Sequence, residues 1–348
     1  MSASAALPLL FAIRQLAMGS SLTESESRAA FDAVMSGEAT PAQLAALLVG
    51  LRVKGETVEE VAGAAGALRG AMVRLDVDRP DELVDTCGTG GGAIGTFNIS
   101  TAAALLAAGL GVRVAKHGNR SFTSQCGSAD VLEALGVPID VGVDVMARAL
   151  REAGIVFMFA PLMHPAMRHV GSVRRELAIP TVMNIVGPLA NPASAGRQVV
   201  GVADARRVPL LAGALRILGT RRALVVHGEP GMDEISPLGS THVVEIREHE
   251  TREWTIDPAR YGLPAGRAEE LRGGPPVANA DAVLAVMENR APPTATAAVI
   301  LNAGAALYVA PDGPTDFGDA IATARDGLKD GAGLRALERL RAAHGRPR

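Results

Sequence analysis

The sequence has little cysteine, few aromatic residues and no large excess of charge of either sign. Its two cysteines, Cys87 and Cys126, lack metal-ligand spacing, so we expect a protein of the reducing cytoplasm. The formal net charge of −3 argues against a nucleic-acid-binding protein, because such proteins normally carry a basic excess. No internal repeat, low-complexity tail or membrane-spanning run occurs. What is present, 348 residues with 48% hydrophobic content, suffices for one large core or two domains.

The first 75 residues carry the start signals of several short helices. Apolar residues recur there with helical period, and an apolar run at 7–13 with no basic residue before it predicts a first amphipathic helix rather than a signal peptide. Three threonines are each followed, three positions later, by the partner of a capping box: Thr23 with Glu26, Thr40 with Gln43 and Thr57 with Glu60. We therefore predict a small, all-helical N-terminal domain over residues 1–76, joined by part of 161–192.

Beyond residue 77 the apolar pattern changes to short runs that alternate mostly with helical segments. The predicted strands lie at 83–84, 112–114, 156–159, 181–185, 199–202, 224–226 and 243–246. The helical segments include 128–136, 143–153 and 208–218. Such alternation is typical of an α/β domain with a mostly parallel central sheet, and we assign residues 77–348 to it.

A glycine-rich loop, 88–92, stands between the first predicted strand and an alanine-rich helix at 100–109. Glycines at such a junction permit positive φ and leave backbone N–H groups open to a ligand. The helix behind them directs the positive end of its dipole to the same place. The loop is therefore a candidate phosphate cradle, although it lacks the Gly-Lys-Ser/Thr ending of a P-loop and the spacing of a dinucleotide-binding loop.

A polar segment, 116–121, follows the second predicted strand and has the sequence Lys-His-Gly-Asn-Arg-Ser. Polar residues at the carboxyl ends of neighbouring parallel strands line the ligand crevice of such sheets. Lysine supplies a point charge, arginine a bidentate fork, and the amide and hydroxyl groups neutral donors, all of which suit phosphate. The two loops together predict one anion-binding mouth.

Three further segments carry candidate functional groups. Basic residues occur at 164–168 and 174–175, and a turn rich in Pro and Asn spans 184–192. Adjacent carboxylates, Asp233 and Glu234, follow another strand end. Near a phosphate mouth they suggest Mg²⁺, which takes oxygen ligands and shares them with substrate phosphates. The alternative is a solvated acidic turn. His117, His164 and His227 are equally compatible with structural roles.

The ordered motifs, from GTGG and TFNIST through AKHGNRS, CGSADVLEALG and HPAMRHV to NIVGPLANP and GMDEIS, resemble the anthranilate phosphoribosyltransferase family over essentially the whole chain. The resemblance implies a helical domain joined to an α/β domain, and a homodimer formed through the helical domain. It implies transfer of the 5-phosphoribosyl group of 5-phosphoribosyl 1-diphosphate (PRPP) to the amine of anthranilate in tryptophan biosynthesis, with release of pyrophosphate. No covalent nucleophile is expected, and no general base is assigned.

The resemblance also implies roles for individual residues. Anthranilate would contact Gly88, Asn119 and Arg174, with Arg174 facing its carboxylate. One Mg²⁺ would bind Ser100 and Glu234, and a second would bind Asp233 and Glu234. The residues implied for PRPP are Gly88, Gly91, Gly92, Thr96, Asn98, Ile99, Ser100, Thr101, Lys116, His117, Gly118, Asn119, Arg120, Ser121, Phe122, Thr123, Ser124 and Ser128.

The sequence departs from the family pattern at Gly92, where the family usually has Asp. We expect this change to tune PRPP affinity or metal dependence without abolishing activity. Two alternatives stay open at this point. One is a pyrimidine nucleoside phosphorylase, which shares the fold and a similar Lys-His-Gly-Asn-Arg segment; the other is a nucleic-acid-binding relative on the same scaffold, which the charge balance disfavours.

Overall fold

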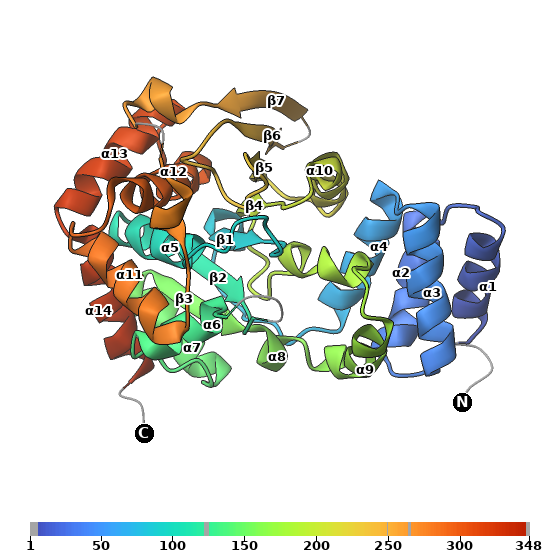
Figure 1. The fold of residues 1–348 in the computed structure, drawn as a ribbon. Coiled ribbons are helices and arrows are strands. Elements are labelled where there is room, and N and C mark those ends of the chain that lie inside the picture. The colour runs from blue at the N-terminus through green and yellow to red at the C-terminus, as the bar shows by residue number, and fades with distance from the viewer. Residues whose placement is uncertain (1–5, 122–124, 249, 264–265, 346–348) are drawn as a thin grey trace. The chain divides into compact units, whose positions relative to one another are not determined.

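The computed structural model describes residues 6–121, 125–248, 250–263 and 266–345 (Figure 1). The chain divides into two compact units. The first, called here the helical unit, comprises residues up to 74 together with 161–192 and 209–219. The second, the α/β unit, comprises 75–160, 193–208 and the chain from 220 onward. The predicted fold class, a small helical domain with a larger α/β domain, is confirmed.

The helical unit begins with four consecutive helices. These are α1 (Ala6–Ala17), α2 (Glu24–Met35), α3 (Pro41–Lys54) and α4 (Val58–Gly70). All three predicted capping boxes are present, at the starts of α2, α3 and α4. In each, the threonine hydroxyl accepts from a backbone N–H of the first turn and the Glu or Gln side chain reaches back, which satisfies two donors that a helix start leaves open. Helix α2 packs on α1 and α4.

The later segments of the helical unit supply α9 (Arg168–Leu177) and most of α10 (Val208–Ile217). The predicted strand at 181–185 is wrong, because these residues form a 3-10 turn, Val182–Asn184. Thr181 starts this turn, and its backbone N–H donates to the Asn184 side-chain oxygen at 3.0 Å. A second 3-10 turn follows at Gly187–Leu189 within the Pro- and Asn-rich segment. Local side-chain capping therefore outweighs the β-forming tendency of Val182 and Ile185.

A seven-stranded sheet forms the centre of the α/β unit, in the order β3-β2-β1-β4-β5-β6-β7. Strands β1 to β5 pair in parallel, and β6 and β7 add an antiparallel edge. The strands are β1 (Val84–Gly88), β2 (Val114–Gly118), β3 (Ile155–Phe159), β4 (Arg197–Gly201), β5 (Arg222–Gly228), β6 (Thr241–Arg247) and β7 (Glu250–Ile256). Strand β7 escaped the sequence analysis because its Glu and Arg residues are exposed at the sheet edge and interrupt any apolar run.

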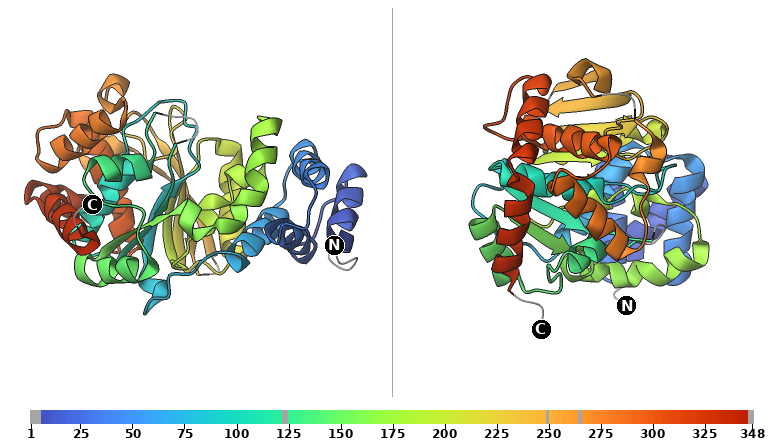
Figure 2. Two further views of the ribbon diagram at one scale, coloured as in Figure 1. Left: turned by 90° about the horizontal axis from the view of Figure 1, so that it is seen from below. Right: turned by 60° about the vertical axis from the view of Figure 1, so that its left-hand side comes forward.

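Helices of the α/β unit gather on one face of its sheet (Figure 2, left). They are α5 (Ile99–Gly109), α6 (Ser128–Ala134), α7 (Val143–Ala153), α11 (Pro276–Met287), α12 (Pro293–Val309), α13 (Phe317–Lys329) and α14 (Ala332–His344). Helix α12 packs on α5, α13 and strand β4, and almost all of its residues are buried. The alanine-rich sequences of α5 and α12 permit this close helix packing around one large apolar core. None of the described helices is long and apolar enough to cross a membrane.

Candidate active site

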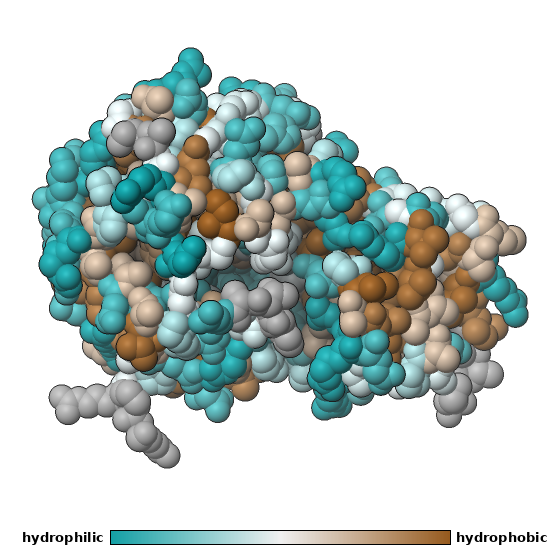
Figure 3. Space-filling model, in the orientation of Figure 1, coloured by the Kyte–Doolittle hydropathy of each residue, from teal (hydrophilic) through white to brown (hydrophobic). Residues whose placement is uncertain are grey.

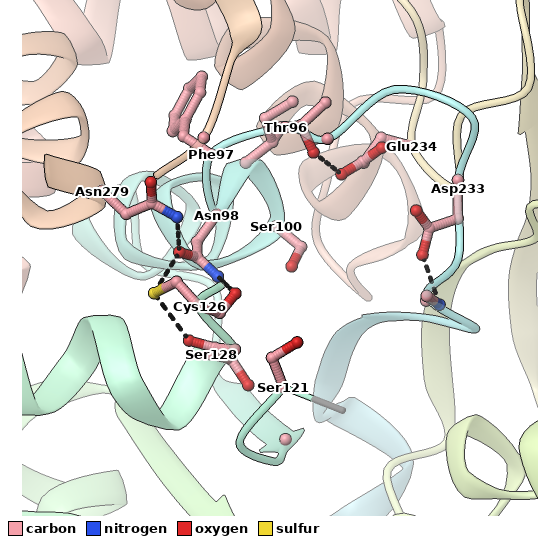
Figure 4. A pocket seen from close by; sticks show the side chains of 18 of the residues that line it. Thr96, Phe97, Asn98, Ser100, Ser121, Cys126, Ser128, Asp233, Glu234 and Asn279 are labelled. Carbon is pink, nitrogen blue, oxygen red and sulfur yellow. Dashed lines mark hydrogen bonds between the residues drawn. The ribbon is translucent and has the colours of Figure 1, made fainter. Parts of the chain in front are cut away.

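A cavity of about 780 Å³ opens at the carboxyl ends of β1 and β2, entirely within the α/β unit (Figure 4). Its walls come from the glycine loop after β1, the start of α5, the segment after β2, the acidic turn after β5 and the start of α11. The carboxyl edge of a parallel sheet is the usual place for a ligand crevice. The two loops singled out in the sequence thus meet in one cavity.

The glycine loop is shaped by its contact with the acidic turn. A Cβ atom at Gly88 would lie 2.4 Å from Oδ2 of Asp233, so any side chain there would collide with that carboxylate. Gly90 and Gly91 have φ values of 69° and 77°, which L residues with side chains rarely adopt. The Gly90 N–H donates to Oδ2 of Asp233 at 2.7 Å. Gly88 and the Asp233 carboxylate are therefore tightly packed against each other.

Helix α5 starts in the cavity wall, with Asn98 and Ser100 exposed to the cavity. The N-terminus of this 11-residue helix, which is the positive end of the helix dipole, is directed toward the same cavity. Lys116, on β2, donates from Nζ to the Thr86 carbonyl oxygen at 2.5 Å and to Ser100 Oγ at 3.3 Å. Burial lowers the pKa of Lys116. Besides offering charge to the cavity, this lysine ties β1 and β2 to the start of α5.

The segment after β2 is held by Asp130, near the start of α6. One carboxylate oxygen of Asp130 accepts from the N–H groups of Ser121 and Gly127, at 3.2 and 2.8 Å. The other pairs with the guanidinium of Arg120 at 2.7 Å. Arg120 also pairs with Glu133 at 2.5 Å, and these two carboxylates raise its pKa. The structure thus assigns Arg120 a role in ordering the loop, in addition to lining the cavity.

Asp233 and Glu234 are partly buried carboxylates that face the cavity from the turn after β5 (Figure 4). Burial raises the pKa of Asp233, although the hydrogen bond that it accepts from the Gly90 N–H acts to lower it. Burial and then the charge of Asp233 raise the pKa of Glu234 well above its usual range, although Thr96 donates to it at 3.0 Å. No Lys, Arg or His of the described chain forms an ion pair with either carboxylate.

This donor set fits a hard cation. Carboxylate and hydroxyl oxygens are magnesium ligands, and the two adjacent, partly buried carboxylates lack a cation in the described chain that would offset their charge. Within the described residues, no cluster of three His, Cys, Asp or Glu side chains could enclose a metal by itself. A cation here would therefore complete its coordination with waters or with oxygens of a bound substrate, which is the usual arrangement for Mg²⁺ beside phosphates.

The sequence analysis missed Asn279, which is 2% exposed at the start of α11. Its Nδ2 donates to Oδ1 of Asn98 at 2.9 Å, and its own Oδ1 accepts from the Gly274 N–H at 2.7 Å. The Cys126 thiol also donates to Asn98 Oδ1, at 3.3 Å. Asn98 is thus held from two sides (Figure 4). The glycine pair before two prolines at 273–276 was the available signal, but nothing in the sequence connects it with residue 98.

Most of the residues proposed for PRPP and metal line the cavity. The lining includes Gly88, Gly91, Gly92, Thr96, Asn98, Ile99, Ser100, Lys116, His117, Gly118, Asn119, Arg120, Ser121, Ser128, Asp233 and Glu234. Thr101 is 1% exposed and lies outside the lining, because its position on α5 turns it from Ser100 into the core. Phe122, Thr123 and Ser124 lie outside the described residues. Arg174 lies on α9 of the helical unit.

The chain matches two family models that together cover most of its length. Residues 80–334 match the α/β domain of a glycosyl transferase family, and residues 12–72 match the helical bundle domain of that family. An anthranilate phosphoribosyltransferase of Roseiflexus sp. is 48% identical over 96% of this chain and 97% of the relative. One from Anaeromyxobacter dehalogenans is 49% identical over 95% of this chain and 97% of the relative.

Solved structures agree with these sequence matches. The crystal structure of anthranilate phosphoribosyltransferase from Thermus thermophilus superposes with a TM-score of 0.90 at 41% identity, over 96% of this chain and 99% of that one. The Saccharomyces cerevisiae enzyme in complex with PRPP and Mg has a TM-score of 0.86 at 25% identity, over 97% of each chain. The relatives favour the transferase over the phosphorylase and nucleic-acid-binding alternatives. This chain belongs to the anthranilate phosphoribosyltransferase family.

Proposed function

We propose that this protein transfers the 5-phosphoribosyl group of PRPP to the amine of anthranilate, giving N-(5-phosphoribosyl)anthranilate and pyrophosphate in tryptophan biosynthesis. The observation that carries the proposal is the partly buried Asp233–Glu234 pair, which lines one cavity with a glycine loop and a helix start. PRPP presents two groups of phosphate oxygens, which require N–H donors and a divalent cation. The cavity offers both kinds of partner.

The residues of the cavity would act by positioning PRPP. The N–H groups of the glycine loop and of the first turn of α5 are available for phosphate oxygens, and the segment 117–121 faces them across the cavity. Ser100, held by Lys116, and the carboxylates of Asp233 and Glu234 would hold Mg²⁺. We propose two ions, one shared by Ser100 and Glu234 and one by Asp233 and Glu234. When bound, Mg²⁺ neutralises charge that develops on the departing pyrophosphate.

The chemistry requires no covalent nucleophile from the protein. The arylamine of anthranilate is uncharged at neutral pH and is itself the nucleophile, so holding it close to the ribosyl carbon supplies much of the rate increase. Fixed N–H dipoles and cations favour the charge distribution of the transition state. We propose that Gly88 and Asn119 contact anthranilate and that the Arg174 guanidinium binds its carboxylate.

The proposal is tested by following the loss of anthranilate fluorescence with purified protein, PRPP and a series of Mg²⁺ concentrations. We expect signal loss only when PRPP and Mg²⁺ are both present. Arg174→Ala should raise the KM for anthranilate on the order of 10- to 100-fold, as expected for one lost charge-assisted pair. Arg175→Ala, an exposed neighbour on the same helix, is the matched control. Phosphate-dependent cleavage of thymidine in place of anthranilate turnover would contradict the proposal.

We further propose a cytoplasmic homodimer that associates through the helical unit. Three apolar side chains of α1 are exposed, with accessible fractions of 65% for Leu7, 36% for Leu10 and 43% for Phe11. Figure 3 shows apolar side chains gathered on this part of the helical unit. Contiguous exposed apolar residues are typical of an interface. Light scattering after size exclusion should give twice the chain mass, and Phe11→Glu should give the mass of one chain.

A further inference from the structure

A row of three arginines crosses the α/β sheet at the edge opposite the candidate active site. In the strand register, Arg197 of β4 lies directly beside Arg222 of β5, and Arg222 lies directly beside Arg247 of β6. Directly paired side chains point to the same face and have Cβ atoms about 5 Å apart, and like charges at that distance destabilise a sheet. Three in succession indicate that something offsets their repulsion.

The protein's own groups offset only part of this charge. Arg222, with 8% of its side chain exposed, donates to Glu245 at 3.3 Å and stacks 4.1 Å above the ring of Tyr308. Its Nε atom is buried without a hydrogen-bond partner in the described chain. Glu245 is shared, because Arg252 pairs with it at 3.2 Å and the Trp254 N–H donates to it. One carboxylate therefore serves two guanidinium groups.

Arg197 finds mainly neutral partners. Its Nε and Nη1 atoms donate to the backbone oxygens of Asp81 and Val309, at 3.1 and 2.7 Å. Burial, and then the neighbouring charge of Arg222, lower its pKa. Arg221, beside the row, pairs with Asp81 at 3.0 Å while more than half of its side chain stays exposed.

These four arginines line a polar cavity of about 360 Å³, together with Asp81, Glu248 and Pro311. The lining itself holds four cations and two carboxylates, and Glu82, Asp312 and Glu245 lie close outside it. Strand β5 begins at Arg222 in this cavity and ends shortly before the Asp233–Glu234 turn of the candidate active site. The two cavities are therefore about one strand length, roughly 20 Å, apart. It belongs to the same unit and shares no residue with the candidate active site.

We propose that the arginine row forms a second anion site, which binds a phosphate-type oxyanion. Guanidinium groups bind phosphate through paired, charge-assisted hydrogen bonds. Here donors reach the cavity from three strands, and a tetrahedral anion accepts from several directions whereas a carboxylate offers one planar edge. The anion is either free phosphate or the phosphate group of a small metabolite. Neither the phosphoribosyl transfer nor its metal requires this site.

The test is a calorimetric titration of the full-length protein with inorganic phosphate, in EDTA and at constant ionic strength. Arg247→Gln removes one guanidinium from the cavity, and because Arg247 is exposed the fold should be kept. Arg206→Gln is the control, since Arg206 has 87% of its side chain exposed, pairs with Asp204 and lies outside the cavity. We expect one binding component to weaken about tenfold or more in Arg247→Gln and to be unchanged in Arg206→Gln.

Phosphate that binds in the candidate active site would appear in the calorimetric titration as a second binding event, with an affinity that Arg247→Gln leaves unchanged. Equal loss of phosphate affinity in both variants would mean that only the long-range charge of the protein matters, and this would overturn the proposal. An unchanged phosphate affinity in Arg247→Gln would overturn it as well. A crystal soaked in selenate should give an anomalous peak beside Arg222, and a peak confined to the first cavity would contradict the site. Glycerol 3-phosphate, titrated in parallel, should compete with phosphate if the site accepts phosphate esters, and should leave it bound if the site takes only the free ion.

Discussion

Carboxylates in the two units of this protein have different surroundings. In the helical unit, Glu60 is fully buried and is satisfied by its own surroundings: the Lys54 ammonium lies 3.0 Å away, and the N–H groups of Leu22 and Thr57 donate at 2.9 and 2.8 Å. In the α/β unit, Asp233 and Glu234 are only partly buried and line a cavity. The charge of Asp233 acts on Glu234, and no cation of the described chain pairs with either carboxylate.

We interpret this difference as that between a structural carboxylate and a proposed metal-binding pair. A buried carboxylate with a complete set of donors holds helices together, and nothing need be added to it. A buried carboxylate pair that lacks a counter-charge is costly in the isolated protein and becomes favourable only when a cation arrives. Exposure points the same way, because Glu60 is fully enclosed whereas Asp233 and Glu234 line a cavity.

The largest expected effect is on the structural side of the comparison. Glu60→Ala should lower the free energy of unfolding by about 3–5 kcal/mol, because it leaves the Lys54 ammonium and two backbone donors without their acceptor. Denaturant unfolding followed by circular dichroism measures this loss. Glu59→Ala, the exposed neighbour in the same helical turn, should change stability by less than about 0.5 kcal/mol. Similar losses in both variants would show that Glu60 is not a special site.

Replacing Glu234 should lower activity and raise stability, the opposite of the effect on stability expected at Glu60. Glu234→Gln should reduce turnover on the order of 10²- to 10³-fold, the usual cost of losing one electrostatic group at a reaction centre. It should also raise the free energy of unfolding measured in EDTA, because a partly desolvated carboxylate next to the charge of Asp233 is removed. Glu229→Gln, an exposed glutamate nearby in the chain, is the control for both measurements. Destabilisation by Glu234→Gln comparable with that of Glu60→Ala would show that Glu234 is a structural carboxylate as well.

A third test concerns a buried base in the helical unit. Burial lowers the pKa of His164 to about 4, although a hydrogen bond with the backbone of Ala190 acts to raise it. The unfolded chain, with a histidine pKa near 6.5, therefore binds a proton that the native state does not. Stability should be fully present above pH 6.5 and fall by up to about 3 kcal/mol as the pH drops toward 4.

Denaturant titrations between pH 7.5 and 4.5 measure this slope. His164→Gln should flatten it, because glutamine keeps a donor and does not titrate. His242→Gln is the control variant, since His242 lies in the α/β unit with 40% of its side chain exposed. An unaltered slope in His164→Gln would assign the acid sensitivity to other groups.

The smallest effect is expected at Gly92. A Cβ atom there would lie 3.3 Å from Oδ1 of Asp233, so Gly92→Asp would bring a third carboxylate to the pair. We expect the Mg²⁺ concentration for half-maximal activity to fall about fivefold, the effect of one added charge a few ångströms away in a solvated site. Gly92→Asn, of nearly equal volume, should not lower it. Equal responses to the two variants would show that crowding, not charge, governs this position.

Local signals allowed much of the fold to be predicted. The capping boxes at Thr23, Thr40 and Thr57 fixed three helix starts, because each is a contact between residues only three apart. The order of strand, glycine loop and helix located the cavity, because parallel strands bring their carboxyl ends together. The family resemblance supplied residue roles that spacing alone does not give.

Features that depend on distant partners could not be predicted from the sequence. Asn279 acts on Asn98 across 181 positions of the chain. The arginine row exists only because the strand register aligns residues 197, 222 and 247. The strand predicted at 181–185 was wrong for a local reason: Asn184 caps the backbone at Thr181, three residues away, and a 3-10 turn results. Each case was decided by a contact that no periodic pattern records.

The close approach of Asp233 to Gly88 has a consequence at the level of the gene. Every codon for glycine begins with two guanines, and only the third base is free. Because any Cβ at position 88 would lie 2.4 Å from the Asp233 carboxylate, every change in the first two bases should impair the protein. In a saturation library under selection, this codon should therefore vary only by silent third-base changes.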